Sequence, residues 1–299
     1  LHKFVSNSRE VLSSISESER ACQVKDVDLN YNELPMQSVL GVKWDIETDA
    51  FMFKVDLSER RATRRGILSI IASVYDPLGF LAPYILNGKK VLQEMCKQGV
   101  GWDEFVLPTD LKPKWDAWLH DLENLQGIQI PRCLIPENIG SIQRLELHHF
   151  SDASSEGYGQ CSYIRAVAEE QVHCALIVGK ARVAPTKVFS IPRLELTAAT
   201  VSVAVSLVLK KELSLKIDQE FFWTDSQVVL GYIKNEARRF HVFVANRVQK
   251  IRNSTDPKQW FYVETSQNPA DCASRGLKVA DMIKSSWLKG PTFLWEREI

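Results

Sequence analysis

Four acidic residues in the second half of the chain stand where strands end or helices begin. Asp152 closes the predicted strand 144–150, and Asp225 closes the predicted strand 220–223. Carboxylate oxygens are the ligands that hard divalent cations such as Mg²⁺ prefer. Two such ions about 4 Å apart can stabilise both the attacking and the leaving oxygen of a phosphodiester displacement. That chemistry needs several acids converging from different elements, and the sequence offers Asp152, Glu195, Asp225 and Asp271.

Each of these acids also fits a purely structural role. Glu195 and Asp271 fall in the predicted first turns of helices, where acids interact favourably with the helix dipole. Asp225 precedes Ser226 and could serve only to cap a helix. Asp152 ends a strand and has no cap to make. All four occurring together, in a regular order of strands and helices, favours a shared metal site over four separate structural roles.

The elements around these acids alternate between strand and helix patterns. Predicted strands cover 144–150, 157–164, 172–179, 220–223 and 260–263, and predicted helices cover 192–213, 226–234, 240–253 and a last segment opening at 268–269. This order is typical of a mixed α/β sheet with helices on its faces. We expect five strands, of which the first three are antiparallel.

The first half of the chain has a different pattern. The sequence predicts a short helix near 8–15, a hairpin from runs 38–44 and 51–55, and helices at 66–75, 83–98 and 111–125. Trp115, Trp118 and Trp223 are predicted core residues. A loop-like stretch at 131–139 marks the predicted domain boundary, and 299 residues are enough for each half to bury its own core.

Composition excludes several classes of protein. Hydrophobic residues make up 45% and charged residues 25%, which is typical of a folded chain. No apolar run approaches the roughly 20 residues that span a bilayer, and the N-terminus has no initiator Met and no signal-peptide pattern. The six cysteines are scattered without a C-x-x-C pair, which argues against zinc and disulfides and fits a reducing compartment. We therefore expect a protein that is not secreted and has no membrane partner.

Positive charge is local rather than global. Lys plus Arg equals Asp plus Glu at 37 each, so any nucleic-acid surface must come from clustering. One cluster comprises Arg60, Arg61, Arg64 and Arg65, and a second comprises Lys234, Arg238, Arg239, Arg247, Lys250 and Arg252.

The segments that carry the acids resemble the ribonuclease H domain of reverse transcriptases, and most closely the Pol polyprotein of BEL/Pao retrotransposons. The motifs are FSDAS at 150–154, IPRLEL at 191–196, WTDS at 223–226 and NPADCASRG at 268–276. In the first half, LGVKWD at 40–45 and DPLGFLAP at 76–83 resemble the reverse-transcriptase tail that follows the polymerase palm. The resemblance covers nearly the whole chain.

This resemblance implies a ribonuclease-H-like mixed sheet flanked by helices, preceded by a smaller, mostly helical domain like the thumb or connection of a reverse transcriptase. Residues 1–135 would be the reverse-transcriptase tail, 140–280 the ribonuclease H domain and 281–299 a C-terminal linker. The implied activity is a two-metal endoribonuclease that cuts the RNA strand of RNA–DNA hybrids. It would use two Mg²⁺ ions, with Mn²⁺ as a substitute. Asp152 and Asp225 would be the central metal ligands, with Glu195 beside them and Asp271 the most peripheral.

The implied partners are an RNA–DNA hybrid and the rest of the Pol polyprotein, including its polymerase palm and integrase, within particles in the cytoplasm or in the nucleus. Arg238, Arg239 and Arg247 are candidates for phosphate contacts, although an ordinary solvated helix face explains them equally well. Ser226 and Asn268 could contact the sugar edge, although both also fit the role of helix N-cap.

Two features depart from the family pattern. The polymerase motif Y-x-D-D is missing from the sequence, so DNA synthesis is not expected from this chain. Many ribonucleases H carry a catalytic His shortly before the fourth acid, but residues 263–267 contain none. Exchange of a proton or a metal would then use water or be slower.

Three rival functions remain. The family is sometimes labelled a peptidase, but an aspartic peptidase needs a D-[ST]-G loop, which the sequence lacks. A DDE-type integrase could use Asp152, Asp225 and Glu264, yet Glu264 ends a predicted strand instead of lying on a helix. A catalytically inert remnant that binds nucleic acid or supports a polymerase is the stronger rival, and the presence of all four acids counts against it.

Overall fold

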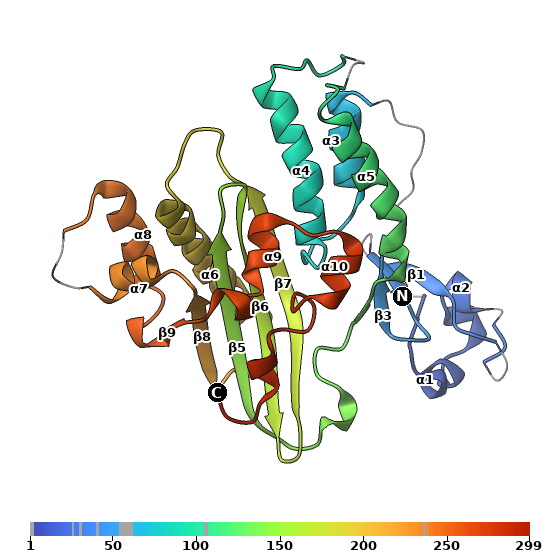
Figure 1. Cartoon of the computed structure of the whole chain (residues 1–299). Helices are drawn as coiled ribbons and strands as arrows, with labels where there is room; N and C mark the ends of the chain where they lie inside the picture. Colours follow the sequence, from blue (N-terminus) through green and yellow to red (C-terminus); the bar gives the residue numbers. More distant parts are fainter. Residues whose placement is uncertain are drawn as a thin grey trace.

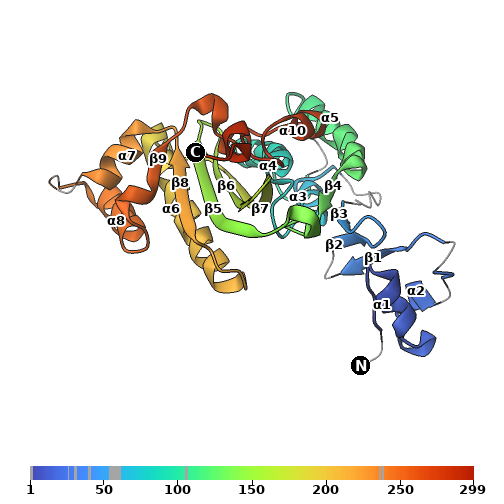
Figure 2. The same ribbon diagram turned by 90° about the horizontal axis from the view of Figure 1, so that it is seen from below.

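A five-stranded sheet with helices on both faces forms the centre of the structure (Figure 1). The computed structural model describes residues 3–25, 27–29, 32–39, 42–53, 62–104, 107–235, 237 and 239–299. A group of three helices stands beside one edge of the sheet, and a small N-terminal lobe lies beyond it (Figure 1, Figure 2).

The central sheet has the topology expected from the sequence. Its strands are β5 (Ile142–Ala153), β6 (Gly157–Ala168), β7 (Val172–Val183), β8 (Gln219–Thr224) and β9 (Trp260–Tyr262), in the order β7-β6-β5-β8-β9. β5 to β7 are antiparallel, while β8 pairs in parallel with β5, and β9 in parallel with β8. The fold is a ribonuclease-H-like mixed sheet.

One face of this sheet is covered by α6 (Ile191–Glu212), with α7 (Gln227–Lys234) and α8 (Val242–Arg252) packed outside it (Figure 2). Ser190 is the N-cap residue and Pro192 occupies the first turn, where proline costs no hydrogen bond. By length and composition α6 could cross a membrane, contrary to our reading of the sequence. Its buried residues, including Leu196 and Val203, instead pack against the sheet and the neighbouring helices.

The opposite face is covered by the C-terminal part of the chain. It comprises η5 (Thr265–Gln267), α9 (Ala270–Arg275), α10 (Val279–Lys284) and η6 (Thr292–Trp295). The short helix η4 (Pro257–Gln259) directly precedes β9 and contacts β8. The expectation that 281–299 is a linker is wrong, because Trp287 and Leu294 are fully buried. The buried guanidinium of Arg165 on β6 also donates to the Leu294 carbonyl at 2.8 Å. This tail therefore belongs to the folded unit.

The three helices beside the sheet are α3 (Arg64–Ser73), α4 (Ala82–Lys97) and α5 (Lys112–Leu122), the last followed by η2 (Glu123–Gly127). The hydroxyl of Thr63 caps α3 by accepting from Gly66 N, which satisfies one of the free amides of the first turn. Trp118 stacks on Tyr84 and on Trp115, with ring centroids 5.0 Å apart in both pairs. The contact between Tyr84 and Trp118 joins α4 to α5.

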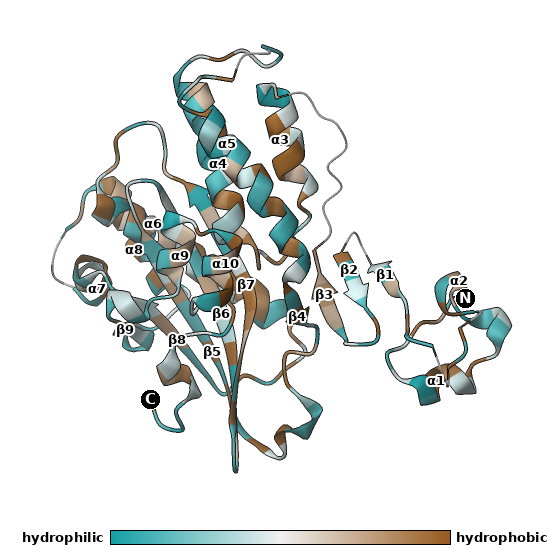
Figure 3. Cartoon of the chain, turned by 45° about the vertical axis from the view of Figure 1, so that its right-hand side comes forward, coloured by the Kyte–Doolittle hydropathy of each residue, from teal (hydrophilic) through white to brown (hydrophobic). Residues whose placement is uncertain are grey.

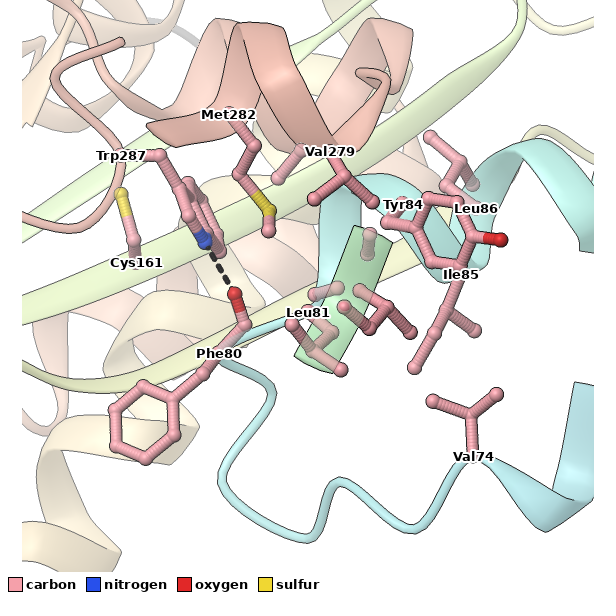
Figure 4. Packing of buried hydrophobic residues seen from close by; sticks show 14 of the residues in the cluster. Val74, Phe80, Leu81, Tyr84, Ile85, Leu86, Cys161, Val279, Met282 and Trp287 are labelled. Carbon is pink, nitrogen blue, oxygen red and sulfur yellow. Dashed lines mark hydrogen bonds between the residues drawn. The ribbon is translucent and has the colours of Figure 1, made fainter. Parts of the chain in front are cut away.

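The helix group and the sheet share one hydrophobic core (Figure 4). Phe80 and Leu81 at the start of α4 lie beside Trp287 and Met282, and the Trp287 indole donates to the Phe80 carbonyl at 2.7 Å. The expectation of two separate cores is therefore wrong. Sequence periodicity shows that each half has apolar faces, but it does not show that those faces meet.

The N-terminal lobe contains α1 (Arg9–Ser14), η1 (Glu17–Glu19), α2 (Cys22–Lys25) and the sheet β1 (Met36–Val39), β2 (Val42–Asp45), β3 (Ala50–Met52) and β4 (Gln129–Pro131). It stands beside the rest of the molecule (Figure 3). The predicted hairpin is present as β2–β3. β4, which pairs with β3, falls at the start of the predicted linker, and η3 (Glu137–Ile139) follows it with Ile139 buried. The linker is therefore partly structured.

Candidate active site

The register of the parallel strands places two of the acids side by side. Ser151 on β5 is paired with Thr224 on β8, and both strands run in the same direction. Asp152 is the next residue on β5 and Asp225 directly follows the end of β8, so the two acids emerge at the same edge of the sheet. In open α/β sheets this edge, outside the carboxyl ends of parallel strands, is where ligands bind.

Helix α9 lies against Asp152 and contributes the fourth acid. The Ser274 hydroxyl donates to Asp152 Oδ2, and Ser274 is fully buried. Asp271, one turn earlier on the same helix, accepts from Arg275 Nε at 2.5 Å. A single short helix therefore holds Asp152 and carries Asp271. The sequence assigned Asp271 of the NPADCASRG motif to the site, but not the contact with Asp152.

Glu195 is brought to the site by α6. It is the fifth residue of that helix and lies just beyond the first turn in which the sequence placed it. The Ser226 hydroxyl donates to Glu195 Oε2 at 2.6 Å, and Ser226 Oγ also accepts from Val229 N as the N-cap of α7. Ser226, the residue after Asp225, thereby connects Glu195 to the end of β8.

Asp225 has one oxygen bonded and one oxygen free. Thr265 Oγ1 donates to Asp225 Oδ2 at 2.8 Å. Asp225 Oδ1 is buried, and it has no hydrogen-bond partner among the described residues. A buried carboxylate oxygen without a donor is costly unless a cation or an ordered water satisfies it.

Burial and mutual repulsion perturb two of the acids. Loss of solvent, together with the nearby carboxylates of Asp225 and Asp271, raises the pKa of Asp152 to about 6, although the Ser274 hydrogen bond opposes this shift. Burial also raises the pKa of Glu195, with Asp225 as a further cause. Repulsion thus links all four acids. A bound cation would relieve it.

The acids are neighbours without forming a finished ligand shell. Within the part of the chain that the structure describes, no three His, Cys, Asp or Glu side chains are grouped so that they could hold a metal ion. The carboxylates are instead turned toward partners of their own, namely Ser274, Ser226, Thr265 and Arg275. The donor set itself suits a hard cation, because every candidate ligand is a carboxylate oxygen and a buried one, Asp225 Oδ1, has no hydrogen-bond partner in the part of the chain that the structure describes.

The expected nucleic-acid contacts lie in different settings. Arg238 lies outside the described residues, and Arg239 is exposed. Arg247 stacks on the Phe243 ring at 3.5 Å and donates to Thr197 Oγ1 at 3.2 Å, so it is partly engaged. Asn268 is buried, where it donates to the Ser151 carbonyl and accepts from Ala270 N.

Ser226 and Asn268 therefore already have intramolecular partners. Ser226 is the N-cap of α7, as its alternative role required, whereas Asn268 lies one residue before Pro269, the N-cap of α9. Contact with a sugar would require those bonds to be exchanged.

Sequence reasoning missed the residues that hold the acids. Ser274 and Arg275 lie three and four positions after Asp271, which is the spacing of neighbours on a helix surface and could have indicated them. Thr265 gave no comparable signal, because its contact with Asp225 depends on where η5 lies against β8.

The chain was then compared with known proteins. A family model described as "Pao retrotransposon-like RNaseH-like domain" matches residues 63–226, which is more than half of the chain. The chain belongs to this family. The resemblance to the ribonuclease H region of retrotransposon Pol proteins is thereby confirmed, and the Pao-like match includes the segments of Asp152, Glu195 and Asp225. The comparison with curated proteins returned no match.

Solved structures similar to this Pao-like chain include several ribonucleases H. RNase H1 of the archaeon Halobacterium salinarum is 12% identical with a TM-score of 0.28, and the match covers 44% of this chain and 94% of that one. LC11-RNase H1, solved in complex with an RNA/DNA hybrid, is 10% identical with a TM-score of 0.28, covering 48% and 100%. A foamy viral protease–reverse transcriptase, solved with dsDNA, is 13% identical with a TM-score of 0.25, covering 80% and 47%. At these scores, none of the three says what this chain does.

Proposed function

We propose that this chain is a two-metal endoribonuclease that cuts the RNA strand of RNA–DNA hybrids. One observation carries the proposal. Asp152 and Asp225 emerge together from adjacent parallel strands, and a carboxylate oxygen of Asp225 is buried without a partner among the described residues. Family membership supports the same reading, since the matched model is that of an RNaseH-like domain.

Four carboxylates would hold the ions, with Asp152 and Asp225 in the centre and Glu195 and Asp271 on either side. Two Mg²⁺ ions, or Mn²⁺ in their place, would supply a polarised water and charge stabilisation for the displacement. Asp152 must be deprotonated to serve as a ligand, and its pKa of about 6 makes this the ordinary state at neutral pH. The Ser226 and Ser274 hydroxyls each hold one oxygen of Glu195 and Asp152, so metal binding would use the other oxygen of each acid or exchange these bonds.

The hybrid would be held mainly through its phosphates. Arg239 lies just before α8 and Arg247 lies on it, and α8 packs against α6, the helix that carries Glu195. Phosphate contacts supply affinity without choosing a sequence, while 2′-hydroxyls in the wide minor groove distinguish RNA from DNA. We further propose that the chain works beside the polymerase palm and integrase of its Pol polyprotein, in particles in the cytoplasm or in the nucleus.

The second candidate is an inert remnant that binds hybrid without cutting it. It is favoured by one observation, the turning of the carboxylates toward serine, threonine and arginine partners. Binding of a metal would have to exchange some of these bonds, whereas an inert remnant would keep them all.

The deciding experiment is cleavage of a labelled RNA–DNA hybrid by the whole chain in Mg²⁺, with hybrid binding measured in parallel. Glu195→Gln should abolish most of the cleavage and spare binding. Glu212→Gln, at the exposed end of the same helix, is the matched control and should cut like the wild type. A wild-type protein that binds hybrid but cuts in neither Mg²⁺ nor Mn²⁺ would establish the inert remnant.

A further inference from the structure

One face of α4 carries three polar side chains that reach out of the helix group. Asn87, Lys90 and Gln93 are spaced three residues apart and therefore share a face of the helix. Each donates to a backbone carbonyl of the ribonuclease H unit: Leu277 at 3.0 Å, Arg275 at 2.8 Å and Ala184 at 2.5 Å. Two segments far apart in the sequence, one at Ala184 and one at Arg275–Leu277, are thus held by one helix.

Lys90 occupies the central position in this row. Its ammonium donates to the carbonyl of Arg275, the last residue of α9, and pairs with Glu156 Oε2 at 2.5 Å. The last carbonyls of a helix lack intrahelical partners, and a cation there also interacts favourably with the helix dipole. Glu156 lies in the turn between β5 and β6, shortly after Asp152. Lys90 therefore links the two segments that carry Asp152 and Asp271.

The fit between α4 and these segments is close. Gly276, which ends α9, has a φ of +83°, and a Cβ at this position would lie 2.3 Å from Asn87 Oδ1. Leu277 N also donates to the Pro83 carbonyl at 3.3 Å. Since side chains are excluded at this junction, α9 has little freedom to shift along α4.

Any displacement of α9 would be passed directly to the acids. Asp271 lies on α9, and Ser274 of the same helix donates to Asp152. We infer that α4, through Lys90 and Asn87, positions the acidic site: it fixes α9 against the β5–β6 turn and so sets where Asp152 and Asp271 point. Both are positioning residues, and the catalytic consequence, though not the placement of α9, rests on the proposed function.

The size of the effect follows from the setting of Lys90. Its side chain is 27% exposed and borders a cleft of about 500 Å³ between α4 and α5, so water screens the pair with Glu156. Substitution of a residue that orients a metal ligand commonly lowers metal affinity by about 10- to 100-fold. Lys90 acts on the ligands indirectly, through α9, so we expect its loss to weaken metal affinity by about three- to tenfold.

The test uses the whole chain with Lys90→Met, Lys90→Arg and a matched control, Lys97→Met. Lys97 is on the same helix and pairs with Glu94 of that helix. Mn²⁺ affinity is measured by calorimetry, hydrogen exchange is followed at the amides of α9, and kcat and KM are determined on the hybrid. Melting temperature is recorded for every variant.

Lys90→Met should bind Mn²⁺ about three- to tenfold more weakly, exchange α9 amides faster and lose kcat at unchanged KM. Its melting temperature should match that of Lys97→Met, and Lys90→Arg should restore the Mn²⁺ affinity, since a guanidinium can donate to the same carbonyl and carboxylate. If Lys90→Met folds poorly, Lys90→Gln replaces it in the same measurements, with the same expected results.

Mn²⁺ affinity and α9 exchange equal to those of Lys97→Met would overturn the inference. A wild-type protein that binds Mn²⁺ but does not cut hybrid would refute the proposed function alone, because affinity and exchange still decide the role of α4.

Discussion

The exchange Asp225→Asn tests the site most directly. Asparagine keeps the size of the side chain, and its amide oxygen can still accept from Thr265 Oγ1 as Asp225 Oδ2 does. The amide nitrogen would then occupy the position of Oδ1, the buried oxygen that has no partner among the described residues. A donor group would stand where a cation needs a ligand, while the surrounding packing is retained.

Loss of one central ligand and its charge should cost several kcal/mol of transition-state stabilisation. Each 1.36 kcal/mol corresponds to a tenfold change in rate, so about 4 kcal/mol gives a fall of about a thousandfold in kcat. Stability without metal should change in the opposite direction. The Asp225 carboxylate is one cause of the raised pKa values of Asp152 and Glu195, and its removal relieves their repulsion.

The assay compares hybrid cleavage, hybrid binding and melting temperature for wild type, Asp225→Asn and Asp116→Asn, the last an exposed acid on α5 that pairs with Lys112. We expect Asp225→Asn to bind hybrid normally, melt at or above the wild-type temperature in EDTA and gain less stability from Mn²⁺. Equal cleavage by wild type and Asp225→Asn would refute the assignment of the acids. A lower melting temperature in EDTA would refute the argument from repulsion.

Three further outcomes are expected. Because burial and neighbouring carboxylates raise the pKa of Asp152 to about 6, the metal-free folded state binds a proton that the unfolded state releases near pH 4, so stability falls as the pH rises toward 6. In EDTA at pH 7.5, Asp152→Asn should therefore raise the free energy of unfolding by up to about 3 kcal/mol, and with it the melting temperature. At pH 4 the exchange should have little effect. Ser274→Ala should raise the pKa of Asp152 further, shifting the acid limb of the cleavage pH profile upward, whereas Ser285→Ala on the neighbouring segment should leave that limb in place. The fragment 140–299 should melt roughly 10 °C or more below the whole chain by calorimetry, since Trp287 and Met282 lose their packing against Phe80 and Leu81; equal melting temperatures would restore the idea of separate cores.

The elements and the acids could be read from the sequence because both are encoded locally. Strand β5 and helix α6 are long and apolar, and Asp152 and Asp225 stand at the ends of the strands that place them. Parallel pairing of β5 and β8 then brings the two acids together without any further information. Short elements were harder to predict from the sequence. β4 was missed because its three residues form a strand only through their pairing with β3.

The contacts that hold the acids could not be read in the same way. Lys90 is separated from Arg275 by more than half the chain, and nothing near Lys90 in the sequence distinguishes it from Lys89 or Lys97. Arg165 likewise binds carbonyls of a tail that looked like a linker. Such contacts depend on how finished elements dock, so they become visible only when the tertiary structure is known.

The extent of the family match agrees with this docking. It begins at Thr63, which caps α3, and ends at Ser226, which caps α7 and holds Glu195. The matched unit therefore unites the helix group with the strands of Asp152 and Asp225, although a boundary near 131–139 would separate them. Packing gives a physical reason, because α4 supplies part of the hydrophobic core that it shares with the sheet. The helix group thus acts as a structural part of the ribonuclease H unit, and a ribonuclease H fragment cut at that boundary would keep all four acids but lose the helix that positions two of them.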